Sequence, residues 1–209
     1  MGRINAARNA ASVRRAVSAS LNLASSWGLV MIDKSKSVAF SDEFIWHYGA
    51  FHASWISGEA LLCYMIGSLL KISHTETHII TAGMEFGRKA AIARNLAYLS
   101  KHPKKKEVIG LIGRLQNESK RNVFAHGLMV NNNETVTFLD RSRGGDYDVT
   151  AYSFSLKEFV LHVQSVAKIG ADLHRAFGAD EADLEAFHQA ALSIANKSAT
   201  SPTRPSSKA

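Results

Sequence analysis

The stretch from Arg121 to His126 carries the residues of this chain that are best suited to chemistry. Arginine is a permanent cation whose forked donors fit a phosphate group, and histidine is the side chain that most readily exchanges protons near neutral pH. Asn122 follows the arginine directly. An arginine that holds a phosphate and a histidine that moves a proton could together cleave a phosphodiester bond without a metal ion.

One helix must present these side chains for that chemistry to be possible. The spacing of apolar residues predicts a helix over residues 105–126, ended by Gly127. Asn122 and His126 are four residues apart and therefore share a face of that helix. Arg121 lies about 140° around the helix from His126, and its side chain is long enough to reach the same edge. The apolar residues between them are expected to anchor the helix in the core.

The flanking segments predict a mainly α-helical protein. Apolar residues at spacings of three and four predict a long helix from a capping Ser41 to about Leu70, and a second helical pattern covers residues 76–100. A capping box at Ser155 begins a last core helix that runs to about Phe177. The first proline is at position 103, so nothing in the first half of the chain forbids long helices.

The segment before this last core helix has a different character. Residues 134–140 and 147–154 are enriched in β-branched and aromatic residues, and Gly144-Gly145 lies between them. This pattern predicts a β-hairpin over about 134–154, inserted before the last core helix.

Composition divides the chain into three parts. Residues 41–178 hold the expected helices and the hairpin. Residues 1–40 are rich in Ala, Arg and Ser and are expected to form a basic arm or helix, although their composition also resembles a transit peptide. Residues 179–209 are expected to form a short helix over 180–196, followed by a disordered tail from Lys197.

The motif and the order of the helices resemble the HEPN superfamily. The HEPN signature is an arginine, four to six residues of which the first is polar, and then a histidine; Arg121, Asn122 and His126 match it. The sequence of helices over residues 42–177 is similar to an antiparallel HEPN bundle, and the hairpin resembles an insertion seen in some members.

The resemblance implies RNA chemistry. Many HEPN proteins are metal-independent endoribonucleases, often toxins or antiviral effectors. By this resemblance His126 would transfer protons at the ribose 2′-hydroxyl or the leaving oxygen, Arg121 would hold the phosphate and stabilise charge in the transition state, and Asn122 would orient the phosphate or His126. The resemblance also implies a homodimer in which two motifs line one cleft, and a partner such as a cognate antitoxin or a regulatory protein.

Two alternatives stay open at this point. Some HEPN domains do not cleave RNA and serve as RNA-binding, dimerisation or interaction modules, so the resemblance does not by itself make this chain an enzyme. The motif could also be purely structural, with Arg121 paired to an acid such as Glu118 and His126 capping the end of its helix.

The basic charge of the chain favours a polyanionic partner. The net charge is +7 at pH 7, and RNA-binding surfaces are typically basic. Lys120 lies beside the motif and is a candidate for phosphate contact. Lys104, Lys105 and Lys106 form a cluster before the motif helix that either binds an RNA backbone or forms a solvated turn.

Other residue patterns do not favour a metal, a cofactor or a membrane. Cys63 is the only cysteine, which excludes an intrachain disulfide and a cysteine-rich metal site. His74 and His78 have a spacing that could hold a metal on a helix, but only Glu76 accompanies them. The glycines form no phosphate-binding loop. The apolar run at 60–70 is shorter than the roughly 20 residues of a membrane span, and we expect a cytoplasmic protein.

Overall fold

The computed structural model describes residues 40–131, 135–141 and 149–200. The basic arm predicted over residues 1–40 therefore lies outside the described residues, except for Phe40, as does the tail from residue 201. The described elements, in chain order, are α2 (Asp42–Leu70), α3 (His74–Thr81), α4 (Phe86–Leu99), α5 (Lys105–Glu118), α6 (Arg121–His126), β1 (Leu128–Asn131), β2 (Thr135–Arg141), β3 (Val149–Ser155), α7 (Leu156–Phe177) and α8 (Glu181–Thr200).

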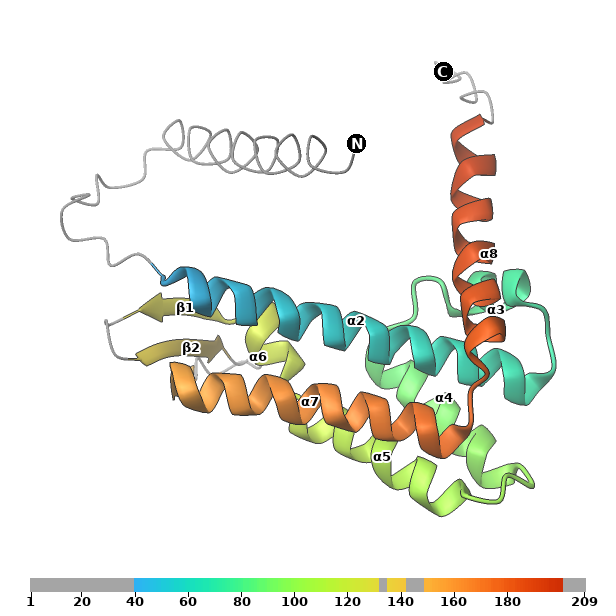
Figure 1. The fold of residues 1–209 in the computed structure, drawn as a ribbon, viewed down its shortest axis with the longest axis horizontal. Helices are drawn as coiled ribbons and strands as arrows, with labels where there is room; N and C mark the ends of the chain where they lie inside the picture. Colours follow the sequence, from blue (N-terminus) through green and yellow to red (C-terminus); the bar gives the residue numbers. More distant parts are fainter. Residues whose placement is uncertain (1–39, 132–134, 142–148, 201–209) are drawn as a thin grey trace, which may run out of the picture. The chain divides into compact units, whose positions relative to one another are not determined.

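The long helix α2 forms where the sequence predicts it and lies at the centre of the core. The hydroxyl of Ser41 caps its first turn by accepting from the backbone N–H of Phe44. Figure 1 shows α2 beside α7, and buried side chains such as Phe51 and Leu62 pack it against α7 and α4. In the described part of the chain, α2 is also the one helix whose length and composition would allow it to cross a membrane. A helix at the centre of a packed core meets the same criterion.

The four core helices do not form the antiparallel bundle that the resemblance predicts. The ring of Trp55 contacts that of Phe86, and Glu59 bonds Lys89, so α4 runs parallel to α2. Aromatic contacts at both ends show that α7 also runs parallel to α2: Phe44–Phe159 and Tyr64–Phe177. Only α5 runs the other way among these four. The reason is that α3 and the turn after it bring the chain back along α2 before α4 begins.

The helical pattern predicted over residues 76–100 is divided into α3 and α4. Ser73 and Glu76 form a capping box at the start of α3. Gly83, in the connection between the two helices, adopts a φ of 70°. Gly67 permits the close packing of α3 on α2, because a Cβ at this position would clash with the side chain of Thr77.

The helix predicted over residues 105–126 is also divided. The helix α5 ends at Glu118, and Lys120 adopts a left-handed φ of 51° before α6 begins. Nε2 of His162, on α7, donates to the carbonyl of the buried Ser119 at 3.1 Å, which holds the chain at this break. The motif therefore occupies a short helix of its own rather than the end of a long one.

A three-stranded antiparallel sheet in the order β1-β2-β3 follows α6. The strands β2 and β3 form the predicted hairpin, whereas Gly144-Gly145 lies outside the described residues. The strand β1 was not predicted; it follows the motif after one residue and pairs Leu128 with Leu139 of β2. One face of the sheet buries Val136 and Phe138, and Phe138 contacts Phe124 of α6.

The last two helices agree with the sequence analysis except at the C-terminal end. Ser155 and Glu158 form the predicted capping box of α7, which ends at Phe177. The helix α8 extends to Thr200, so the prediction of disorder from Lys197 is wrong for residues 197–200. Ala, Lys and Ser are compatible with a helix, and the first proline that would stop it is Pro202.

Candidate functional site

The structure brings the three predicted motif side chains together on α6. Nη1 of Arg121 lies 3.0 Å from Nε2 of His126 and 3.3 Å from Oδ1 of Asn122. A guanidinium group only donates hydrogen bonds, so in this arrangement Nε2 of His126 is the acceptor and the imidazole is neutral with its proton on Nδ1. Asn122 and His126 are exposed and Arg121 is half-buried. The site therefore presents a cation and an imidazole to solvent.

The structural alternative for these residues does not agree with the geometry. Glu118, the expected acid partner of Arg121, instead accepts two hydrogen bonds from Arg114, at 2.8 and 3.1 Å. None of the ion pairs found in the described ranges includes Arg121. The end of α6 is closed by the N–H of Gly127, which donates to the carbonyl of Val123 at 2.8 Å, rather than by the ring of His126.

A buried phenylalanine anchors this six-residue helix. A helix this short is not stable by itself in water. Phe124 is only 1% exposed, and its ring contacts those of Phe51, Phe138 and Phe159 at centroid distances of 4.8, 4.7 and 5.4 Å. The hydroxyl of Tyr48, on α2, donates to the carbonyl of Phe124 at 2.6 Å. Tertiary contacts therefore hold the motif in place.

Gly127 sets the position of His126 at the junction of α6 and β1. Its backbone is extended, with a φ of −68° and a ψ of 144°, so it does not end the helix through a left-handed conformation. A Cβ at this position would instead clash with the carbonyl oxygen of Val123 and lie 3.3 Å from that of Leu139. The absence of a side chain permits the abrupt change from helix to strand directly after the histidine.

The structure adds two histidines that the sequence analysis did not select. His52 is half-buried on α2, with its ring 4.6 Å from that of Tyr48 and 5.4 Å from that of Phe51. Burial, and then the positive charge of Arg121, lower the pKa of His52 below its ordinary value. Burial also lowers the pKa of His162, despite its hydrogen bond to the Ser119 carbonyl. No spacing along the chain indicates that these residues approach the motif.

The predicted lysines fall into two separate groups. Nζ of Lys120 lies 4.5 Å from the centre of the Tyr152 ring, beside the motif. Lys104, Lys105 and Lys106 lie at the other end of α5, a helix of 14 residues that spans about 20 Å at roughly 1.5 Å per residue. Nζ of Lys105 also donates to the carbonyl of Tyr98 at 3.1 Å. Of the four, only Lys120 adjoins the motif.

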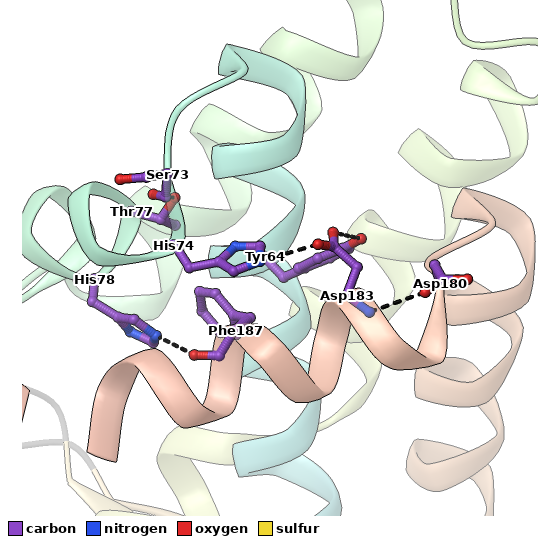
Figure 2. Close-up of polar contacts among 8 residues, drawn as sticks. All are labelled: Tyr64, Ser73, His74, Thr77, His78, Asp180, Asp183 and Phe187. Carbon is purple, nitrogen blue, oxygen red and sulfur yellow. Dashed lines mark hydrogen bonds and ion pairs between the residues drawn. The ribbon is translucent and has the colours of Figure 1, made fainter. Parts of the chain in front are cut away.

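His74 and His78 have structural partners rather than a shared metal site. Nε2 of His74 lies 3.0 Å from Oδ1 of Asp183, and Nε2 of His78 donates to the carbonyl of Phe187 at 2.9 Å. Figure 2 shows both rings directed at α8, where Asp183 also accepts from the hydroxyl of Tyr64 at 2.7 Å. Over the ranges that the structure describes, no group of three His, Cys, Asp or Glu side chains could hold a metal ion.

A pocket of about 370 Å³ lies between α2, α7 and α8. Its lining is mostly apolar and includes Leu61, Ala171 and Leu184, with His174 and His188 as the largest polar groups. None of the motif residues lines it. The motif lies instead on α6, next to the sheet (Figure 1).

Comparison with protein-family models, with curated proteins and with solved structures gave no significant match for this chain.

Proposed function

We propose that this is an RNA-directed protein of the HEPN type, and that it cleaves RNA without a metal ion, in a defence or toxin–antitoxin context. The observation that carries this proposal is the pairing of Arg121 with His126. Their side chains are 3.0 Å apart on an anchored helix, and within the described residues no carboxylate bonds to either of them. A cation without a carboxylate partner is free to bind an anion such as phosphate.

The proposed roles follow from the hydrogen bonds of the unliganded site. A phosphate group would replace His126 as the acceptor for Arg121, which would release Nε2 of the imidazole for proton transfer. Arg121 would then neutralise the charge that develops on the phosphate in the transition state. Asn122 would keep the guanidinium oriented through its Oδ1. Lys120, next to the motif, would contact a neighbouring phosphate.

Lys104, Lys105 and Lys106 would extend the same RNA path along α5. The separation of about 20 Å is that of a 14-residue helix, which corresponds to several nucleotides of extended single strand. We propose that these lysines contribute salt-dependent affinity without a direct effect on the reaction.

We further propose a cytoplasmic homodimer that places two motifs in one cleft, with an antitoxin or regulatory protein as a second partner. Large apolar side chains are exposed on α2, which contacts the motif helix, and on β1, which follows it, and they support an interaction surface. On α2 these are Ile45, Trp46 and Ile56, and on β1 they are Leu128 and Val130.

A non-catalytic RNA-binding or interaction module is the second candidate. It is favoured by the resting hydrogen bond between Arg121 and Nε2 of His126, because a histidine held in this way takes no part in proton transfer unless a ligand displaces it.

The two candidates are separated by incubating the wild type and His126→Ala with total RNA in the presence of EDTA. We expect cleavage by the wild type alone. His47→Ala is the matched control, because His47 lies on α2 and its ring meets that of its neighbour Trp46 edge-on. If neither protein cleaves and both shift RNA on a gel, the binding module is correct. If neither binds RNA, both candidates fail.

A further inference from the structure

We infer that His52 is a second catalytic group of this site: it accepts the proton of the ribose 2′-hydroxyl, while His126 donates a proton to the leaving 5′-oxygen. The inference rests on the proposed cleavage of RNA and names a residue outside the Arg121–His126 motif.

The reaction itself requires two proton-transfer groups. The 2′-oxygen attacks phosphorus as it loses a proton, and the 5′-oxygen leaves on the opposite side as it gains one. A single imidazole cannot reach both oxygens at once when they lie in line across the phosphorus atom. The motif supplies one histidine per chain, so within one protomer the second group must come from another element.

The packing of α2 against α6 brings His52 to this site. The hydroxyl of Tyr48 donates to the carbonyl of Phe124, within the motif, at 2.6 Å. His52 follows Tyr48 by one helical turn, and their rings are in contact at 4.6 Å. His52 therefore lies on the face of α2 that meets α6. Its ring nitrogens form no hydrogen bond with any residue that the structure describes, so they are available to a substrate.

The neighbouring groups favour His52 as the base. Burial and the charge of Arg121 lower the pKa of His52 from its ordinary value of 6.5, which favours the neutral form that a base requires. Burial raises the pKa of Tyr48, so this hydroxyl remains protonated. His162, on α7, already donates from Nε2 to Ser119. Nζ of Lys120 lies over the ring of Tyr152, so His126 is left as the acid.

The proposed step is balanced within the site. Nε2 or Nδ1 of neutral His52 takes the 2′-hydroxyl proton as the new O2′–P bond forms. The P–O5′ bond breaks, and the 5′-oxygen takes a proton from Nε2 of His126, which has gained that proton from solvent after the phosphate replaced it as the acceptor for Arg121. The products are a 2′,3′-cyclic phosphate and a free 5′-hydroxyl, with Arg121 holding the non-bridging oxygens.

The first test compares wild type, His52→Gln and His47→Gln in the cleavage of a short RNA in EDTA. We expect His52→Gln to reduce kcat/KM by about 10²- to 10⁴-fold, the usual contribution of a proton-transfer group, with RNA affinity nearly unchanged. We expect the cleavage rate of the wild type to fall at acidic pH, where His52 is protonated. This acidic fall should be absent from the pH profile of His52→Gln. His47→Gln should behave as the wild type. Circular dichroism and thermal unfolding show whether each variant is folded. If His52→Gln does not fold, His52→Asn replaces it in the same comparison.

The second test does not depend on activity. Histidine titrations followed by NMR should give His52 a pKa below 6.5 in the wild type, and a higher one in Arg121→Gln, because the lowering charge is removed. Addition of a 2′-deoxy RNA analogue should shift the ring signals of both His52 and His126.

The outcomes separate this inference from the proposed function. Cleavage by the wild type together with full activity of His52→Gln overturns the role of His52 and leaves the proposed function intact. Absence of cleavage by the wild type overturns the proposed nuclease, and the role of His52 with it. A His52 signal that does not respond to the analogue while that of His126 does also overturns the inference.

Discussion

His74 and His78 are four residues apart, as are Asn122 and His126, yet the first pair is engaged in contacts between helices and the second is exposed at the surface. Between α3 and α8, His74 contacts a carboxylate and His78 donates to a backbone carbonyl, while Phe187 packs against both rings (Figure 2). On α6, His126 accepts from a guanidinium group at an exposed surface. The first arrangement fixes one helix on another. The second leaves a cation and an imidazole accessible to an anion.

The largest expected effect is the loss of RNA cleavage when Arg121, in the exposed region, is replaced by lysine. Lysine keeps the charge but loses the fork that holds phosphate in two places, so we expect RNA cleavage to fall by about 10²- to 10³-fold. Arg114→Lys is the matched control, because Arg114 lies one helix earlier and pairs with Glu118. Equal activity of both variants would show that the motif needs only a positive charge.

Replacement of Phe187 by alanine should affect the other region alone. Phe187 is 1% exposed and holds α8 against α2 and α3, and loss of such a buried ring costs about 3–5 kcal/mol. Hydrogen exchange should show faster opening of the amides of α8 and no change in α6. Faster exchange in both helices would mean that the two regions unfold as one unit.

Replacement of His78 and of His126 by alanine compares the two regions directly, with a smaller expected change in the free energy of unfolding. We expect His78→Ala to lower the free energy of unfolding by about 1–2 kcal/mol, since it loses a hydrogen bond and a stacked ring. His126→Ala, an exposed residue, should change it by less than about 0.5 kcal/mol. Urea unfolding of both variants measures this difference. A larger loss for His126→Ala would assign His126 a structural role.

The smallest expected effect is the change in stability at alkaline pH that arises from the hydrogen bond between Tyr64 and Asp183 of α8. Burial, followed by the hydrogen bond to Asp183, raises the pKa of Tyr64 to about 12 from an ordinary value of 10.0. A raised pKa favours the folded state while the phenol is protonated, so this stabilisation is complete below pH 10 and is lost as the pH rises towards 12. The unfolding temperatures of the wild type and of Tyr64→Phe should become more similar as the pH rises from about 10 to about 12. A constant difference would contradict the prediction.

Much of the fold could be predicted from the sequence because its signals are local. Ser41 and the capping box at Ser155 mark the true starts of α2 and α7, and the apolar spacing extends each helix to its observed end. The sequence did not reveal the breaks within two predicted helices. At the break between α5 and α6, Lys120 adopts a left-handed conformation in a segment whose apolar pattern continues on both sides. The parallel direction of α4 was also missed, since it depends on how α3 returns along α2.

The candidate site divides in the same way. The sequence by itself determined the types and the spacing of Arg121, Asn122 and His126, because these residues are close along the chain. The pairing of Glu118 with Arg114, four residues earlier on α5, is also local. Only the tertiary structure decided that the helix breaks at Lys120, where His162 of α7 bonds the carbonyl of Ser119, and that Arg121 therefore begins a helix of its own. The tertiary structure also placed His52 beside the motif, since their proximity arises from the packing of two helices that are distant in the sequence.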